Sequence, residues 1–171
     1  MDTLPMWFRN LSLFRFSESV AESLKALETD LDRHRLRPCG AMELSTRGFV
    51  SPHGRNAEML VHRVANYALL TLGGEDKLLP GSVVNEELAA RLQKITDTEG
   101  RRIGARERKR LKDEVLTDLL PRAFVRPYRL NAYLDAKNGW LVVDTASRKS
   151  AGSVARAVER LHEPPSLHRA P

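Results

Sequence analysis

The positive charge of this chain is concentrated in one window of twelve residues, Arg101–Lys112. The window holds seven basic residues and one acid, Glu107, and therefore carries a charge of +6. The whole chain also carries +6, so the remaining residues contain 21 bases and 21 acids and balance to zero. Guanidinium and ammonium groups gathered in this way bind phosphates, so the window predicts a polyanionic partner. The candidate contact residues are Arg101, Arg102, Arg106, Arg108, Lys109, Arg110 and Lys112.

The residues around the window favour contacts to a nucleic-acid backbone. Ala68 to Ala123 contains no Phe, Tyr or Trp on which an unpaired base could stack. Gln93 is the only Asn or Gln between positions 86 and 130, so amides that read base edges are scarce. Contacts to phosphates position a protein without specifying sequence. The pattern therefore predicts sequence-tolerant binding, and composition alone leaves both DNA and RNA open.

Two other interpretations of the window stay open. The basic residues are also compatible with the solvated face of an ordinary helix, because Arg106, Lys109 and Arg110 fall opposite an apolar stripe. Alternatively, the chain is a protein-interaction module whose basic helix docks an acidic partner. A membrane partner is disfavoured, because a helix that seeks the bilayer surface places bulky aromatic residues beside its cations.

The other residues capable of chemistry form no recognisable catalytic or metal-binding motif. The five histidines lack HxxxH and HExxH spacing, and a single cysteine cannot build a zinc site. His53 is expected to be a turn residue with no second ligand nearby. Asp135 and Asp144 flank Lys137-Asn138-Gly139 and could meet across a hairpin as the metal pair of a nuclease, but we expect them to terminate strands. The sequence therefore predicts no enzyme, no metal and no cofactor.

Cysteine usage and hydropathy indicate the compartment. Cys39 is the only cysteine, which is typical of a reducing environment, and we expect it to be a small buried residue rather than a nucleophile. The sequence shows no secretory signal pattern and no run of about 18 apolar residues. We therefore expect a cytoplasmic protein.

Apolar periodicity, capping residues and turn signals predict the elements that must position these residues. Gly73-Gly74 is expected to end the first β-rich block, and Gly100 and Gly104 to mark the join of two helices. The predicted elements are a strand over 7–16, a helix over 18–34, a strand over 48–50, a hairpin over 59–72, helices over 81–97 and 105–120, and strands over 128–134 and 140–145. A final helix is expected to begin after a cap at Ser147 or Ser150, with Val154, Val158 and Leu161 as its apolar stripe.

This order predicts an α+β fold, with an antiparallel β-rich central domain, flanking helices and an inserted two-helix tip. The expected boundaries are 1–78 for the first part of the central domain, 79–121 for the helical tip, 122–163 for the second part of the central domain, and 164–171 for a loose tail.

Several short motifs, in this order, resemble the bacterial recombination-associated protein RdgC family. The most specific block is Leu111-Lys112-Asp113-Glu114-Val115-Leu116 running into Leu119-Leu120-Pro121-Arg122-Ala123-Phe124. The likeness spans about residues 6–160. The other matching blocks are Trp7-Phe8-Arg9-Asn10-Leu11, Pro38-Cys39-Gly40, Gly48-Phe49-Val50-Ser51-Pro52, Leu78-Leu79-Pro80, Asn138-Gly139, Val142-Val143-Asp144 and Ala146-Ser147.

The resemblance implies a non-enzymatic, nucleoid-associated protein that binds duplex DNA without sequence preference. Members of that family form a ring-shaped homodimer around DNA and act in recombination, where they restrain RecA by competing for DNA. Their helical tip meets its counterpart in the other subunit, which carries onto Phe124, with Leu119 and Leu120 of the same motif. The family's positive inner surface supports the basic window as the DNA contact. Family chains also continue past the point where this sequence ends, through a further domain that closes the other side of the ring.

Overall fold

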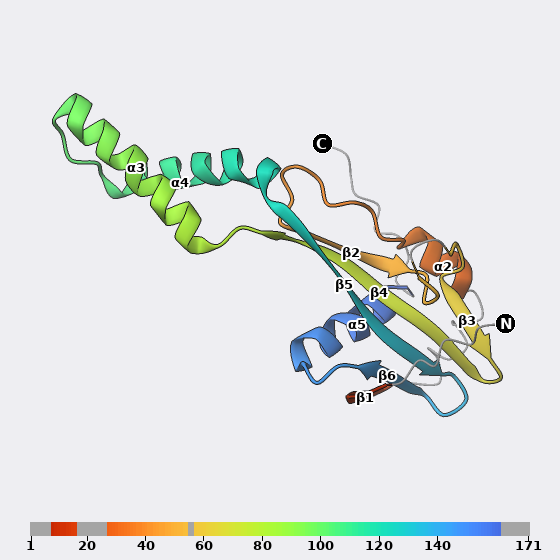
Figure 1. Ribbon diagram of the computed structural model, residues 1–171. Helices are drawn as coiled ribbons and strands as arrows, with labels where there is room; N and C mark the ends of the chain where they lie inside the picture. The colour runs from red at the N-terminus through yellow and green to blue at the C-terminus, as the bar shows by residue number, and fades with distance from the viewer. Residues whose placement is uncertain (1–7, 17–26, 55–56, 162–171) are drawn as a thin grey trace, which may run out of the picture. The chain divides into compact units, whose positions relative to one another are not determined.

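The computed structural model describes residues 8–16, 27–54 and 57–161, and the predicted α+β class is confirmed (Figure 1). The described residues form an antiparallel sheet of six strands and four α-helices. The chain divides into two compact units. Unit 1 comprises residues 1–37, 47–74 and 128–171, and unit 2 comprises residues 38–46 and 75–127.

The sheet follows the order β1-β6-β5-β4-β2, with β3 paired to β4. β3 and β4 form the predicted hairpin, whose two turn residues are Ala65 and Asn66. β6 also pairs antiparallel with β1 on one side and with β5 on the other. The strand bounds are Leu11–Arg15 (β1), Ser45–Val50 (β2), Val61–Val64 (β3), Tyr67–Leu78 (β4), Phe124–Asp135 (β5) and Trp140–Asp144 (β6).

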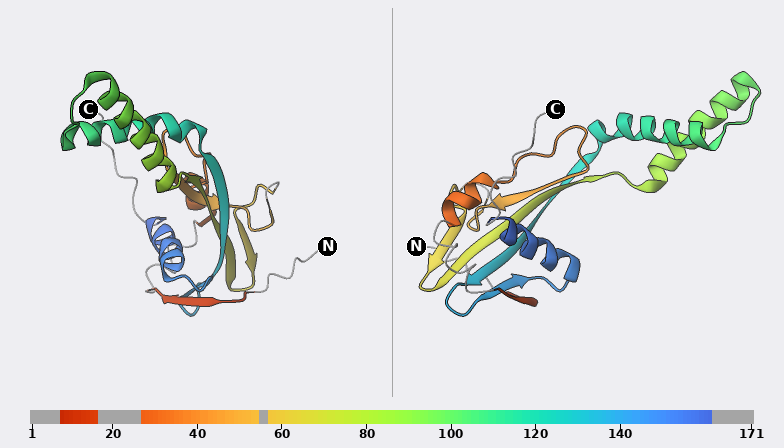
Figure 2. Two further views of the ribbon diagram at one scale, coloured as in Figure 1. Left: turned by 60° about the vertical axis from the view of Figure 1, so that its left-hand side comes forward. Right: turned by 180° about the vertical axis from the view of Figure 1, so that it is seen from behind.

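Two helices cover the core of unit 1. These are α2 (Leu27–Arg33) and α5 (Arg148–Arg160), and α5 lies across one face of the strands in both Figure 1 and Figure 2. The predicted cap of α5 is confirmed at Ser147, whose hydroxyl accepts a hydrogen bond of 3.2 Å from the Ser150 amide. The predicted apolar stripe is also confirmed, because Val154, Val158 and Leu161 are buried in this core. Burial of this stripe, together with residues of α2 and the strands, contributes to the hydrophobic stabilisation of the unit.

One boundary prediction was wrong: Gly73-Gly74 does not end a β block but lies inside β4, which continues to Leu78. Both glycines are needed for close packing. A Cβ atom on Gly74 would lie 2.2 Å from Cζ of Tyr128, and one on Gly73 would lie 2.8 Å from Cγ1 of Val50. Glycine is weak in strands on average, but here it admits a neighbouring side chain against the backbone, so tertiary packing overrides local preference.

Replacing Gly74 by alanine is therefore expected to destabilise the protein. The added methyl group would overlap the Tyr128 ring, and overpacking of this kind costs about 1–3 kcal/mol. Urea unfolding measures the change in the free energy of unfolding. Gly81→Ala is the matched control, because a Cβ there meets nothing within 4 Å. An unfolding midpoint that Gly74→Ala leaves unchanged would contradict this role for the glycine.

The hairpin between β5 and β6 forms as predicted but with different bounds. β5 begins at Phe124 and runs through Pro127, whereas the prediction placed its start at 128. Asp135 pairs with Trp140, so the turn consists of residues 136–139 and contains the predicted Lys137-Asn138-Gly139. Asp135 holds this turn by accepting hydrogen bonds from the Asn138 backbone and side chain, at 3.1 and 2.8 Å. Gly139 completes it with φ of 71°, a conformation that glycine adopts without strain.

Unit 2 is built around the two predicted helices, which are confirmed as α3 (Gly81–Glu99) and α4 (Ala105–Leu119). Gly100 ends α3 in the left-handed conformation, with φ of 62°, and Gly104 precedes α4. Both glycines therefore mark the join as predicted. A short 3₁₀ helix, η2 (Leu120–Arg122), follows α4, and Pro121 within it prevents the α-helix from continuing.

Some predictions fall on residues outside the described ranges. These are the strand before Phe8, the helix over 18–26 and the tail over 164–171. None of the helices within residues 27–54 and 57–161 combines the length and the apolar character that are needed to cross a lipid bilayer.

Candidate nucleic-acid interface

The basic window lies on the helical hairpin of unit 2, which has its own apolar core. Val84 and Leu88 of α3 pack with Leu111 and Val115 of α4, and all four are buried. Figures 1 and 2 show the two helices side by side. Residues at i and i+4 lie on one face of a helix, so this core fixes which face of α4 is turned to solvent.

Polar contacts between the helices hold the hairpin in register. Arg91 of α3 donates a hydrogen bond of 2.8 Å to Asp118 of α4 and one of 3.1 Å to Glu87. The contact with Asp118, more than the one with Glu87, raises the pKa of Arg91. Where α4 ends, Nζ of Lys77 donates hydrogen bonds to the carbonyl oxygens of Leu120 and Ala41, at 2.6 and 2.7 Å. Lys77 thereby satisfies a carbonyl at the C-terminal end of the helix.

The solvent face of α4 carries the cations that the sequence singled out. Arg106, Lys109 and Arg110 lie opposite Leu111 and Val115 and are exposed. The exposed Arg108 and Lys112 lie nearer the edge of the apolar face, and Arg101 and Arg102 belong to the loop before α4. The structure therefore brings all seven predicted contact residues onto α4 and the loop that leads into it.

The seven cations differ in how far acids already neutralise them. Arg101 donates two hydrogen bonds of 2.7 Å to Glu107 and one to Glu99, and these contacts raise its pKa. The same pair lowers the pKa of Glu107. Arg110 is 3.5 Å from Glu114 in an exposed i, i+4 pair, an interaction that is weak in water. Of these seven cations, five make no ion pair with a residue that the structure describes: Arg102, Arg106, Arg108, Lys109 and Lys112.

The position of these cations on α4 is unfavourable for the helix itself. Basic side chains are destabilising near the positive N-terminal end of a helix dipole, yet Arg106 and Arg108 lie in the first turns of α4. Gly104 offers no side chain to cap the first amides. The first turn also contains one acid, Glu107, but Arg101 pairs with it. The uncapped amides, the helix dipole and the arginines at this end together attract an anion. This arrangement favours a binding role over a merely solvated face.

The three apolar residues predicted at a dimer interface differ in exposure. Phe124, the first residue of β5, is 82% exposed, the largest exposed fraction among the large hydrophobic residues described. Leu119 is half-buried against the helix pair, and Leu120 is buried, with 7% exposed. Phe124 is therefore the residue of the three that offers its side chain to a partner.

The carboxylates of Asp135 and Asp144 do not form a metal pair. Asp135 is opposite Trp140, and Asp144 lies four residues further along β6, opposite Leu11. At about 3.4 Å per residue, their backbones are roughly 14 Å apart. Asp144 instead accepts hydrogen bonds from the amides of Arg9 and Asn10, at 2.9 and 3.0 Å. Both residues anchor strand ends, as expected, and the Asn138 side chain lowers the pKa of Asp135.

Cys39 and His53 are two other residues for which the sequence made a prediction. Cys39 is half-buried rather than fully buried, and its thiol donates to the Glu43 carbonyl at 3.4 Å. His53 lies in a loop as predicted, but the ring of His62 approaches it edge-on, with centroids 4.6 Å apart. This contact could not be predicted, because the two residues lie in different segments of the chain. The described residues contain no group of three or more His, Cys, Asp or Glu side chains that could hold a metal ion.

A second group of cations in the structure was not predicted from the sequence. Arg47, Arg156 and Arg160 line a pocket of unit 1, although they come from distant segments. Charge counting could not reveal them, because acids elsewhere balance their charge. Only the folded sheet, with α5 across it, brings them together.

Fold and surface together define an α+β protein in which a cationic helical hairpin is inserted between two long strands of an antiparallel sheet. The chain belongs to the RdgC family: the family model described as "Putative exonuclease, RdgC" matches residues 6–167. The resemblance seen in the sequence motifs is thereby confirmed.

Similar proteins carry the name recombination-associated protein RdgC. The chain is 49% identical to the one from Stenotrophomonas maltophilia (strain R551-3) over 146 residues. The aligned region covers 85% of this chain and 48% of that protein. The chain is 48% identical over 150 residues to the one from Xanthomonas campestris pv. campestris (strain B100), covering 87% and 49%. For Xylella fastidiosa (strain 9a5c) the identity is 46% over 157 residues, covering 91% and 51%. The chain thus spans about half the length of the curated relatives it matches.

Proposed function

We propose that this chain binds duplex DNA without sequence preference, without catalysing a reaction, and acts in DNA recombination. The observation that carries the proposal is the solvent face of α4, where exposed cations without acid partners gather on a rigid hairpin. Membership of a family whose members are named for recombination supports the process. In that process the protein competes with RecA for DNA and is associated with the nucleoid.

The hairpin binds the backbone of the duplex rather than its bases. Arg and Lys neutralise phosphates, whereas the surface of α4 offers no Asn or Gln side chain for base edges. Phosphate contacts of this kind are insensitive to sequence and sensitive to salt, because each one releases counterions. Two subunits joined through Phe124 would present two hairpins to one duplex.

The test is a titration of a random duplex by fluorescence anisotropy at several salt concentrations. If the five unpaired cations each neutralise one phosphate, the logarithm of affinity should fall with the logarithm of salt with a slope of about −4.5 per subunit. Between 50 and 200 mM salt, affinity would then fall on the order of 500-fold. Duplexes of different sequence should give the same curve.

Three outcomes would contradict the proposal. A flat salt response would remove phosphate contacts as the source of affinity. Absence of binding at low salt, with specific capture of one acidic protein, would favour the interaction-module hypothesis. Loss of intact duplex when Mg²⁺ is added would show that the protein is an enzyme.

A further inference from the structure

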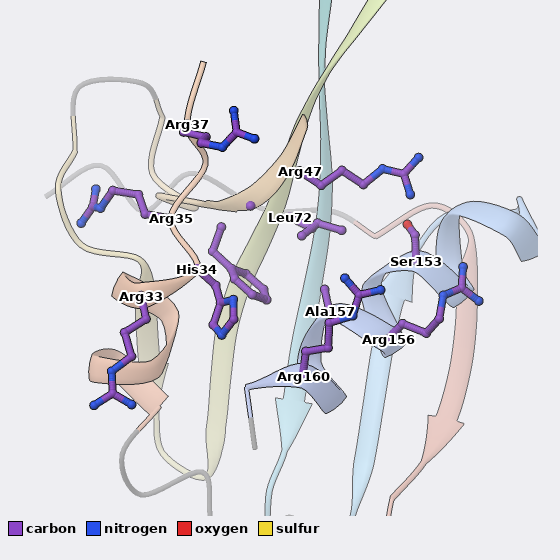
Figure 3. A pocket seen from close by; sticks show the side chains of 12 residues that line it. Arg33, His34, Arg35, Arg37, Arg47, Leu72, Ser153, Arg156, Ala157 and Arg160 are labelled. Atoms are coloured by element: carbon purple, nitrogen blue, oxygen red, sulfur yellow. The ribbon is translucent and has the colours of Figure 1, made fainter. Parts of the chain in front are cut away.

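The pocket of unit 1 is open to solvent and lined almost wholly by basic and small residues (Figure 3). Its volume is about 300 Å³, enough for a phosphate group with part of its sugar. None of the twelve described residues that line it is an acid. The basic residues that line it are Arg33, His34, Arg35, Arg37, Arg47, Arg156 and Arg160.

Three separate elements build the pocket. The segment after α2 runs beside β2, where the Leu36 amide donates to the Phe49 carbonyl at 2.9 Å and the Phe49 amide to the His34 carbonyl at 2.8 Å. A Cβ on Gly48 would lie 2.4 Å from the Leu36 nitrogen, so this glycine permits the approach of the segment. Phe49 and Leu72 form a buried floor. The third wall is α5.

The cations of the pocket fall into two groups. Arg33 is 3.4 Å from Asp30 and Arg35 is 2.9 Å from Asp32, and Figure 3 shows both side chains extending away from α5. By contrast, exposed Arg47, Arg156 and Arg160 make no ion pair with a described residue. These three, defined here as the arginine triad, lie on the side of the pocket formed by β2 and α5 (Figure 3).

The triad is costly for the folded protein unless an anion binds. Arg156 and Arg160 are an i, i+4 pair of like charge on α5, a spacing that destabilises a helix. The C-terminal dipole of α5 compensates for Arg160, which lies in its last turn, but not for Arg47 on a different element. Planar guanidinium groups are matched to phosphate oxygens, which they bind with two parallel hydrogen bonds.

The remaining lining residues indicate that only the backbone of a nucleic acid is recognised here. The aromatic ring of Phe49 is buried in the floor, with 1% exposed, and cannot stack on a base. Apart from His34, the only lining residue with an uncharged polar side chain is Ser153. The lining contains no Asn or Gln that could read a base edge. A site with these properties holds phosphates and tolerates any sequence.

We infer that the arginine triad is a second phosphate-binding site, located on unit 1, which holds the backbone of duplex DNA independently of the hairpin. The inference rests on the proposed function and identifies a contact surface that the basic window does not include. Each of the two units then carries its own group of unpaired cations.

The test uses the full chain with Arg47, Arg156 and Arg160 all changed to Gln. With the triad, the slope for a random duplex should be about −7.2 per subunit, and the Gln variant should return it to the −4.5 expected for the hairpin alone. Affinity should fall at least tenfold at low salt. Changing the same three residues to Lys should preserve the slope, because counterion release counts charges. The matched control changes Arg9, Arg63 and Lys137 to Gln, which removes equal charge from exposed positions of unit 1 outside the pocket.

The outcomes separate this inference from the proposed function. If the unmodified chain shows no salt-dependent binding, the proposed function fails. A different result refutes the second site alone: the unmodified chain binds DNA with a steep salt dependence, but the Gln triad variant has the same affinity and salt slope. The second site is also refuted if the triad variant loses no more affinity than the control variant. If the Gln variant keeps its DNA affinity but loses binding to a polyglutamate peptide, the pocket serves an acidic protein segment and the inference is overturned. Circular dichroism verifies folding, and single Gln variants at Arg47 and Arg160 replace the triple variant if it does not fold.

Discussion

Changing Arg106, Lys109 and Arg110 together to glutamate is expected to reduce affinity for random duplex DNA on the order of a hundredfold or more. Replacing Arg106 and Lys109 removes one phosphate contact each, and all three substitutions add a charge that repels the backbone. At roughly 0.5–1 kcal/mol for each of these five losses, the sum is about 2.5–5 kcal/mol, and every 1.4 kcal/mol is about tenfold in affinity. Anisotropy titrations at fixed salt, with duplexes of several sequences, measure the loss.

Helix stability should change little while affinity falls. Arg106 lies in the first turn of α4, where a glutamate interacts favourably with the helix dipole by about 0.3–1 kcal/mol. Glutamates at 109 and 110 place like charges at i, i+4 from Asp113 and Glu114, which costs about 0.2–0.5 kcal/mol for each pair and offsets this gain. The variant should therefore be as stable as the unmodified chain while binding DNA less, which excludes unfolding as the cause. The control reverses the charge of Arg9, Arg63 and Lys137, and an equal loss of affinity there would show that net charge alone matters.

The helical hairpin could be predicted from the sequence because its signals are local. Apolar residues at helical spacing, the absence of aromatic residues, and Gly100 and Gly104 at the ends are all read within about forty residues. The cationic face follows from the same window, since periodicity places Arg106 and Lys109 opposite Leu111.

The parts that could not be predicted depend on contacts between distant segments. Gly74 looks like a strand breaker until Tyr128 of β5 is placed against it. The arginine triad is invisible for the same reason, because Arg47 and Arg156 approach one another only after β2 and α5 pack in unit 1. Local propensity and charge counting carry no information about such pairs.

The second large effect concerns assembly: Phe124→Ser is expected to raise the dissociation constant of the proposed homodimer about 30-fold or more. Phe124 is 82% exposed, so within one subunit its ring contributes little to the core. An exposed aromatic ring that inserts into a partner is the kind of residue that dominates an interface, and its loss costs about 2–4 kcal/mol. Sedimentation velocity over a range of protein concentrations measures the dimer population.

Folding of each subunit should be unaffected, because a surface substitution away from caps and the core changes stability by about 0.5 kcal/mol or less. Val64→Ser is the matched control, since Val64 is an exposed apolar residue of β3 in unit 1. Duplex affinity should fall together with the dimer, because joining two hairpins makes the second contact intramolecular. The salt slope per complex should then halve as well. If the dimer persists in Phe124→Ser, Phe124 is not part of the interface. If the dimer is lost but DNA affinity is unchanged, dimerisation does not contribute to DNA binding.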